Sequence, residues 1–117
     1  MVSILWFTRA SKIKVSFEAV AWDTTATVVA KLILIISTPT NSYYYNKLKQ
    51  WYIYTTTPTD YYEIVQSDLS TQNPTQYSLT TAPVPFASEF NFGIQLNNSY
   101  SKTLTIGNLK IEQVTLF

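Results

Sequence analysis

The segment TVVAKLILIIST, residues 27–38, is the stretch that decides the fold class of this chain. It is rich in β-branched residues, which pack well on the pleated surface of a sheet. Its central run LILII, residues 32–36, is apolar at every position, and so short a run is typical of a buried strand rather than of a membrane span. Because residues of both parities are apolar, the segment predicts a central strand that is covered on both faces.

Two further segments show the alternation of strands that turn one face to a core. Ile13, Val15 and Phe17 alternate with polar residues, and the segment EFNFGIQLN, residues 89–97, follows the same pattern. After Phe17 the apolar residues change parity, which predicts a bulge or a change of face near Ala19.

The C-terminal part of the chain predicts a β-hairpin. Two strand-like runs, residues 103–106 and 109–117, flank the dipeptide Gly107-Asn108, which has the length and composition of a two-residue hairpin loop. Glycine adopts positive φ without steric cost, so we expect Gly107 to occupy the positive-φ position of the turn. Gly93, inside a predicted strand, indicates a bulge or a close contact.

The segment YYYNKLKQWYIY, residues 43–54, is half aromatic in a chain with an aromatic content of 15%. We expect its first tyrosines, 43–45, to lie in a loop, and residues 48–54 to form a strand. A second short strand is expected at YYEIVQ, residues 61–66.

Strand parity divides the aromatic residues between two faces. Successive side chains of a strand point to opposite sides. Trp51 and Ile53 therefore share one face, and their apolar character indicates the core. Tyr52 and Tyr54 share the other face, where they are free to contact a ligand or a partner.

Together these patterns predict an all-β protein with about seven to nine short antiparallel strands. We expect an antiparallel β-sandwich of the jelly-roll type, because the strands are uneven and the connections between them are long. No linker composition divides the chain, so a single β-sandwich domain over residues 1–117 is predicted.

Three segments of the chain together resemble a known family. They are KIKVSFEAVAWDTTATVVAKLILI at 12–35, KQWYIYTTT at 49–57, and FNFGIQLNNSYSKTLTIGNLKIEQVTLF at 90–117. In strand pattern and spacing, over about two thirds of the chain, they resemble the galactose-binding-like jelly roll of carbohydrate-binding modules. Where that family commonly has Asp-Asn before its last strand, this chain has Gly107-Asn108. The resemblance implies a jelly-roll fold and a carbohydrate ligand.

Composition excludes several kinds of chemistry. The chain has no histidine and no cysteine, which rules out a cysteine nucleophile, a histidine base and the usual zinc sites. Asp60 and Glu63 are close in sequence, yet the pattern does not direct them into one cleft as a glycosidase requires. We therefore expect no enzyme activity, no catalytic residue, no metal and no cofactor.

Charge and hydropathy bear on partners and location. A net charge of +1 gives no electrostatic basis for nucleic-acid binding, and no partner of that kind is expected. No apolar run is long enough to span a membrane. The run from Val2 to Phe7 is shorter than a signal peptide requires, and the positive charges follow it. A polar surface without a secretion signal suggests a virion component or another extracellular surface protein.

Two functions remain open for the tyrosines. Interfaces between proteins concentrate tyrosine and tryptophan and are depleted in charge at their centres, which favours a structural subunit of a virion, capsid or spike that forms homo- or hetero-oligomers. Aromatic rings also stack on sugars, so the alternative is a carbohydrate-binding or lectin-like receptor-binding module. In either case the candidate contact residues are Tyr43, Tyr44, Tyr45, Tyr52, Tyr54, Tyr61 and Tyr62.

Overall fold

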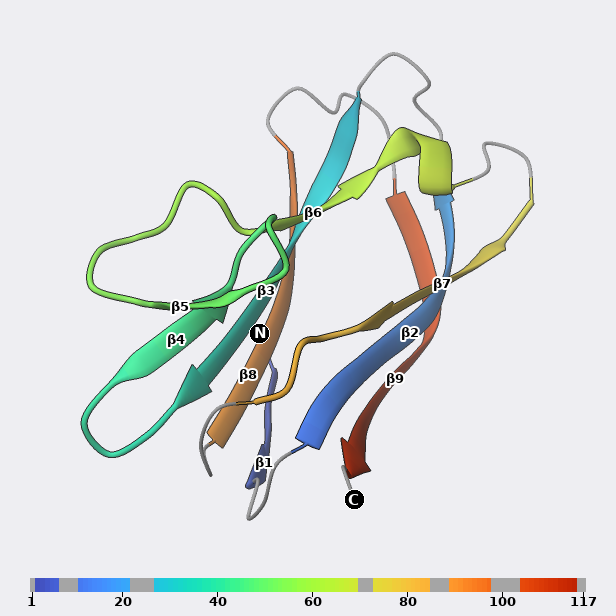
Figure 1. Cartoon of the computed structure of the whole chain (residues 1–117). Helices are drawn as coiled ribbons and strands as arrows, with labels where there is room; N and C mark the ends of the chain where they lie inside the picture. Colours follow the sequence, from blue (N-terminus) through green and yellow to red (C-terminus); the bar gives the residue numbers. More distant parts are fainter. Residues whose placement is uncertain are drawn as a thin grey trace.

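The computed structural model describes residues 2–6, 11–21, 27–69, 73–84, 89–97 and 104–115, and its strands are antiparallel throughout (Figure 1). The elements are β1 (Val2–Trp6), β2 (Ser11–Ala21), β3 (Val28–Ser37), β4 (Ser42–Tyr45), β5 (Trp51–Ile53), β6 (Tyr62–Val65), a 3-10 turn η1 (Gln66–Asp68), β7 (Thr75–Thr80), β8 (Glu89–Leu96) and β9 (Leu104–Thr115). The prediction of an all-β chain is confirmed.

The described strands form two sheets that pack face to face. The larger sheet has the order β1-β8-β3-β4-β5, and β6 pairs with β3 beside β4. The smaller sheet has the order β7-β2-β9. The predicted antiparallel β-sandwich is confirmed. The described strands divide into six and three, so the jelly-roll subtype stays a prediction, as does the single domain over residues 1–117.

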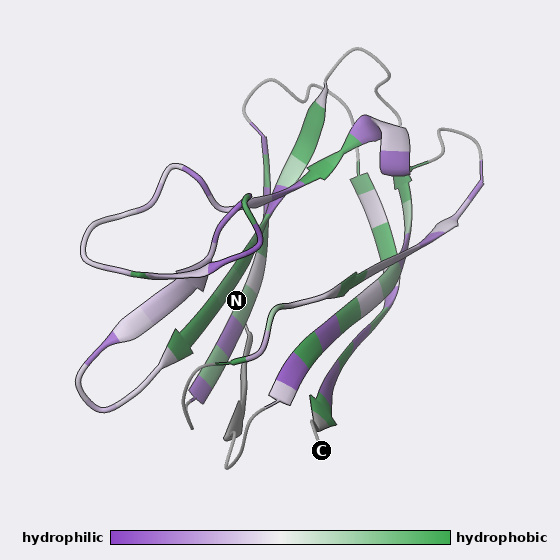
Figure 2. Cartoon of the chain, viewed as in Figure 1, coloured by the Kyte–Doolittle hydropathy of each residue, from purple (hydrophilic) through white to green (hydrophobic). Residues whose placement is uncertain are grey.

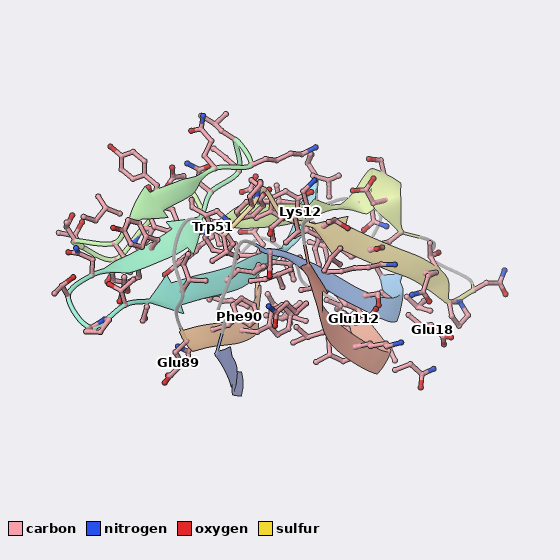
Figure 3. The ribbon with its side chains drawn as sticks, turned by 60° about the horizontal axis from the view of Figure 1, so that its bottom comes forward. Lys12, Glu18, Trp51, Glu89, Phe90 and Glu112 are labelled. Carbon is pink, nitrogen blue, oxygen red and sulfur yellow. The ribbon has the colours of Figure 1, made fainter. Side chains whose placement is uncertain are left out.

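The core lies between the two sheets and follows the predicted alternation. Phe17 of β2 is fully buried, and its ring stacks on that of Tyr77 from β7 at a centroid distance of 5.1 Å. Phe90 of β8 is also fully buried, whereas its neighbour Glu89 points away from the core (Figure 3). The stripes of hydropathy along β2 in Figure 2 show the same period of two. Burial of one face on each strand therefore holds the two sheets together.

β3 differs from its prediction on one face. Leu32, Leu34 and Ile36 are fully buried in the core, as expected for a central strand. Ile33 and Ile35 point to the opposite side and are only half-buried. The expectation that β3 is covered on both faces is therefore wrong. Its apolar outer residues, visible as the continuous apolar stretch of β3 in Figure 2, lie on a face of the sandwich.

The predicted C-terminal hairpin is also wrong. β9 runs without a turn and pairs with β2 from the Ser11↔Thr115 pair to the Ala21↔Leu104 pair. The Gly107-Asn108 dipeptide lies at a register shift within this pairing, which is a β-bulge. Asn108, with φ of 54°, takes the left-handed conformation that we assigned to Gly107. The irregularity predicted near Ala19 belongs to this partner strand, because β2 keeps its core parity through Ala19.

A tight hairpin joins β4 and β5, where we expected a loop followed by one strand. Tyr43, Tyr44 and Tyr45 belong to β4, and the turn occupies residues 46–50. The Asn46 side-chain oxygen accepts hydrogen bonds from the backbone N–H groups of Leu48 and Gln50, each at 3.0 Å. An asparagine that bonds its own backbone in this way stabilises a turn.

A short segment after β7, residues 81–84, connects the two sheets. Its backbone bonds to β2, with Thr81 N–H donating to the Ile13 carbonyl at 2.9 Å. Its other side is bound by the large sheet. The Ala82 N–H donates to the Tyr45 hydroxyl at 3.0 Å, and the Trp51 indole N–H donates to the Ala82 carbonyl at 3.1 Å. Tyr45 and Trp51 therefore hold the edge of the sandwich closed.

The ends of the described chain pair inside the sandwich. β1 pairs with β8, and β9 pairs with β2. Both segments therefore have pairing partners within the chain. From its sequence, the apolar Phe117 is a further candidate for contact with another subunit, and it lies outside the described residues.

Candidate functional site

The sandwich presents a tyrosine cluster, which consists of Tyr44, Tyr52, Tyr54 and Tyr61, on the outer face of its large sheet. Tyr44 lies opposite Tyr52 in the β4–β5 pair, and opposed residues of antiparallel strands share a face. Tyr54 follows β5, and Tyr61 precedes β6 in an isolated bridge with Asn46. The predicted outward parity of Tyr52 and Tyr54 is confirmed.

Tyr44 is the centre of this cluster. Its ring meets the rings of Tyr52, Tyr54 and Tyr61 edge-on, at centroid distances of 6.2, 6.3 and 5.5 Å. Such edge contacts are the favoured geometry of aromatic pairs. The Tyr44 hydroxyl donates a hydrogen bond of 2.6 Å to Oδ1 of Asp60. The ring contacts and this charge-assisted bond fix the orientation of the cluster before any ligand arrives.

The environment of the cluster holds the phenols of Tyr44 and Tyr61 in the protonated form. The hydrogen bond to Asp60, together with burial and the carboxylate charge, raises the pKa of Tyr44 to about 12. Burial raises the pKa of Tyr61 to about 12 as well, and a hydrogen bond with Tyr54 adds to the shift. At neutral pH these hydroxyls are therefore hydrogen-bonding groups without charge, and they supply no base or nucleophile.

A hollow of about 310 Å³ opens beside the cluster. It is lined by Tyr44, Tyr52 and Ile53 and by the loop 55–60, which contributes four threonines, a proline and Asp60. Tyr52 is the most exposed ring of the cluster, with 57% of its surface open to solvent. The hollow thus offers one aromatic surface, several hydroxyls and one carboxylate, which suit a neutral ligand rich in hydroxyl groups.

The other three predicted tyrosines point to the opposite side of the sheet. Tyr45 is almost completely buried, and its ring lies 4.9 Å from that of Trp51 and 5.8 Å from that of Tyr62. Tyr43 and Tyr62 are partly buried and pack against the core. The predicted set of seven tyrosines therefore divides into four that face outward and three that stabilise the sandwich.

Trp51 and Ile53 share the inner side of β5, as parity predicts, but only one of them packs in the core. Trp51 packs against the core cluster. Ile53 keeps 42% of its surface exposed, because it lies near the end of an edge strand. Its assignment to the core is wrong.

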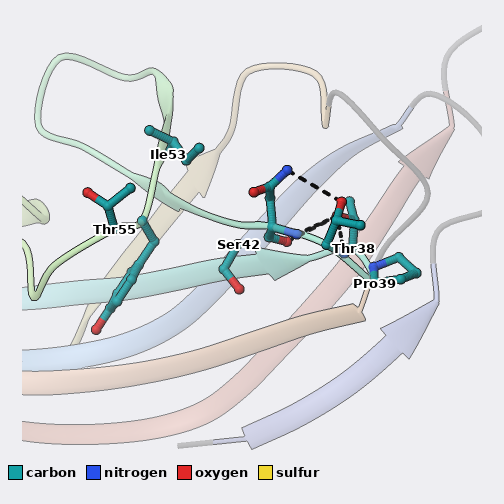
Figure 4. A pocket seen from close by; sticks show the side chains of 8 residues that line it. Thr38, Pro39, Ser42, Ile53 and Thr55 are labelled. Atoms are coloured by element: carbon teal, nitrogen blue, oxygen red, sulfur yellow. Dashed lines mark hydrogen bonds between the residues drawn. The ribbon is translucent and has the colours of Figure 1, made fainter.

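A second hollow, of about 330 Å³, lies between the β3–β4 loop and the end of β5 (Figure 4). Its polar groups mainly serve the turn itself. The Thr38 hydroxyl accepts a hydrogen bond from the Asn41 N–H at 3.0 Å and donates one to the Asn41 carbonyl at 3.1 Å. The polar groups of this hollow therefore stabilise the β3–β4 turn.

The two outer faces of the sandwich differ in charge. On the small sheet, Lys14 of β2 lies opposite Glu112 of β9, and Glu112 is 3.7 Å from Lys110. Lys12 and Lys14 thus belong to a solvated strand face. Glu18 at the far end of β2 is exposed as well.

Among the described residues, the strands at the centre of the outer face of the large sheet carry no charged side chain. The Asp60 carboxylate reaches this face from the loop 55–60, where it accepts the hydrogen bond of the Tyr44 hydroxyl. We define this uncharged face as Ile33, Ile35, Asn91, Gly93, Tyr44 and Tyr52, which the strand register places side by side. Charged residues occur at its ends, with Lys31 opposite Glu63 at one end and Glu89 at the other. An apolar centre with a charged border is the anatomy of a protein interface.

The chain was compared with known protein families, curated proteins and solved structures. No family model, curated protein or solved structure matches the chain. The resemblance to galactose-binding-like modules therefore stays an expectation. Over the part of the chain that the structure describes, no three carboxylates converge on a possible metal site, and no helix is long and apolar enough to cross a membrane.

Sequence reasoning missed Asp60 as a member of the site and overlooked the outer isoleucines. The position of Asp60 depends on how the loop 55–60 folds back, which leaves no periodic signal. Ile33 and Ile35 had a signal, since the run 32–36 is apolar at every position, but the same pattern fits a strand buried on both faces.

Proposed function

We propose that this chain is a non-enzymatic structural protein that assembles with other protein subunits through the uncharged face of its large sheet. The observation that carries the proposal is the contrast between the two outer faces: one is charged and solvated, and the other joins half-buried isoleucines to exposed tyrosine. An assembly of this kind fits a capsid or spike subunit of a virion, and so a location on a particle or another extracellular surface.

Three features support an interface rather than a bare surface. The aromatic and aliphatic residues are contiguous across β3, β4 and β5, and large exposed apolar patches usually mark contact sites. Tyr44 is held in place by Asp60 and by three ring contacts, so little side-chain entropy is lost on binding. Charged side chains lie at the ends of the strands, and Asp60 lies in the loop 55–60, where charge contributes to specificity more than to affinity.

The test introduces a charge into the centre of the face. Ile35→Lys places an ammonium group beside Tyr44, and its burial in an interface is expected to weaken association by about tenfold or more. Ser78→Lys adds the same charge to the exposed outer side of β7 and serves as the control. Sedimentation velocity over a range of concentrations measures the masses. A parent that stays monomeric at high concentration, or equal effects of the two substitutions, would contradict the proposal.

The hollow beside the tyrosine cluster favours a second candidate function, which is carbohydrate binding. Sugars stack their C–H faces on exposed rings, and their hydroxyls pair with carboxylates and threonines. Tyr52 and Asp60 both line the hollow and provide this combination. The resemblance of the strand pattern to carbohydrate-binding modules agrees with this candidate.

Affinity electrophoresis through gels that contain polysaccharide, together with a glycan array, tests the second candidate. Tyr52→Ala is expected to abolish retardation, because a stacked ring contributes most of the apolar contact to a sugar. Tyr54→Ala, which removes a more buried member of the same cluster, is expected to weaken binding less. Absence of binding by the parent, or equal binding by the parent and both variants, would remove this candidate.

A further inference from the structure

β5 forms one edge of the large sheet, as far as the described strands show. It pairs with β4, and among the described residues no strand pairs with its other edge. The Asn46 N–H donates to the Gln50 carbonyl at 2.9 Å, and the Tyr54 N–H donates to the Ser42 carbonyl at 2.8 Å. Hydrogen-bonded and non-hydrogen-bonded pairs alternate along antiparallel strands. Tyr44 and Tyr52 therefore form the next hydrogen-bonded pair, midway between the other two.

This register decides which backbone groups face outward. The N–H and C=O groups of Tyr52 point to β4. Those of Trp51 and Ile53, on either side of it, point away from the sheet. β5 therefore presents two donors and two acceptors at its edge, centred on Tyr52. Free edges of this kind are templates for pairing with another strand.

Three of the six exposed large hydrophobic side chains in the described part of the chain lie at or beside this edge. Leu48, in the turn before β5, is 71% exposed, Tyr52 is 57% exposed and Ile53 is 42% exposed. These include the two most exposed large hydrophobic residues in the described part of the chain. A partner along this edge would cover Tyr52 on the outer side and Ile53 on the inner side.

We infer that β5 pairs antiparallel with β5 of a second copy of this chain, with a two-fold axis at Tyr52. In this register Trp51 lies opposite Ile53 of the partner subunit, and the outward donors and acceptors of each strand meet those of the other. The pairing forms four backbone hydrogen bonds and joins two large sheets into one. An isologous contact of this type is self-complementary and closes as a dimer. The inference rests on the proposed assembly role and names its partner and its edge.

The distribution of charge favours this orientation. Residues 50–59, which contain β5 and the following loop, carry no charge, whereas Lys47 and Lys49 lie in the turn before β5. Antiparallel pairing places the two lysine-bearing turns at opposite ends of the joint, each beside the uncharged threonines 55–57 of the other copy. Parallel pairing would bring Lys49 beside its own copy, where like charges repel.

The pairing also makes use of the two sides of the strand. On the inner side, Ile53 comes to lie against Trp51 of the partner subunit, which is a cross-strand pair of an aliphatic and an aromatic residue. On the outer side, the two Tyr52 rings become neighbours. Tyr52 forms a non-hydrogen-bonded pair with the partner's Tyr52, and in such pairs the Cα atoms are about 4.5 Å apart.

A cysteine scan can read this register directly, because the chain contains no cysteine. A Cα separation of about 4.5 Å falls within the range that a disulfide accepts. Tyr52→Cys is therefore expected to form a disulfide-linked dimer in high yield on mild oxidation. Leu48→Cys is the matched control, since Leu48 is more exposed but its two copies are on the order of 27 Å apart across the axis at 3.4 Å per residue. It is expected to remain uncrosslinked.

Ile53→Pro supplies a second, independent variant. It removes an N–H group that points away from β4, so the β4–β5 hairpin keeps its hydrogen bonds. The substitution deletes two symmetry-related hydrogen bonds of the dimer, and sedimentation equilibrium is expected to show at least about tenfold weaker dimerisation. Circular dichroism that matches the parent verifies the fold.

The outcomes separate this inference from the proposed function. Equal crosslinking of both cysteine variants, or no crosslinking of Tyr52→Cys in a parent that does associate, would overturn the β5 dimer. If association is then lost in Ile35→Lys alone, the assembly role stands without the β5 joint. A monomeric parent with no Tyr52→Cys dimer would overturn both.

Discussion

Replacing Tyr45 with alanine is expected to lower the free energy of unfolding by about 3–5 kcal/mol, as for other large aromatic residues in cores. Tyr45 is almost fully buried, and its ring contacts Trp51 and Tyr62. Its hydroxyl also accepts the hydrogen bond of the Ala82 N–H, which would be left without this acceptor. The loss therefore combines a cavity with an unsatisfied backbone donor. Urea denaturation followed by circular dichroism measures it.

Two controls divide this loss into its parts. Tyr45→Phe keeps the ring and removes only the acceptor, so we expect a loss of about 1–3 kcal/mol. Tyr52→Ala removes an exposed tyrosine of the neighbouring strand and is expected to cost less than about 1 kcal/mol. If Tyr45→Ala cost no more than Tyr52→Ala, the role of Tyr45 in closing the sandwich would be refuted.

Alkaline pH is expected to unfold the protein between about pH 10 and pH 12. Tyrosines in the unfolded chain ionise near pH 10, whereas the pKa values of Tyr44 and Tyr61 are raised to about 12 in the folded state. Burial also raises the pKa of Tyr77. Above pH 10 the unfolded chain has released protons that the folded chain still holds. Stability is thus complete below pH 10 and decreases as the pH rises toward 12.

Phenolate absorbance and circular dichroism, recorded together during an alkaline titration, check this expectation. The tyrosines whose pKa values are raised, Tyr44, Tyr61 and Tyr77, are expected to ionise together with the loss of the β-sheet signal. Tyr44→Phe removes one of the groups with a raised pKa and should make the dependence of stability on pH less steep. Ionisation of all nine tyrosines in one step near pH 10, with the sheet intact, would contradict the assigned environment.

The sandwich could be predicted because its signal is local. Alternation in β2 and β8, and the β-branched residues of β3, depend only on which side of a strand meets the core. The same reasoning placed Trp51 and Tyr52 on opposite faces of β5, which the structure confirms. Parity survives errors in the exact strand limits, so the division of the tyrosines was largely accessible from sequence.

The connections could not be predicted as well, since distant parts of the chain decide them. Gly107-Asn108 has the composition of a hairpin loop, but β2 offers a long edge on which residues 104–115 can pair without interruption. Continuous pairing over this length satisfies more backbone groups than a short hairpin, so the dipeptide becomes a bulge. Asn46 is the converse case, since it forms a turn inside a segment whose many aromatic residues indicated a strand.

The site combines both cases. The outward orientation of Tyr52 and Tyr54 follows from parity, whereas the contact of Tyr44 with Asp60 depends on the path of the loop between β5 and β6. Ile53 shares its side of β5 with Trp51, but it lies near the end of an edge strand and keeps 42% of its surface exposed. Parity gives the side of a strand on which a residue lies, and it does not give the extent of the opposite layer.

The position of β2 has a consequence for how the protein folds during synthesis. Its two partners, β7 and β9, begin at Thr75 and Leu104, so β2 leaves the ribosome long before either partner exists. Contacts between residues so distant in sequence form slowly. Until they form, β2 and the apolar strand β3 expose unpaired edges and apolar side chains in the nascent chain. We expect these strands to be aggregation-prone at that stage and to be chaperone-binding segments.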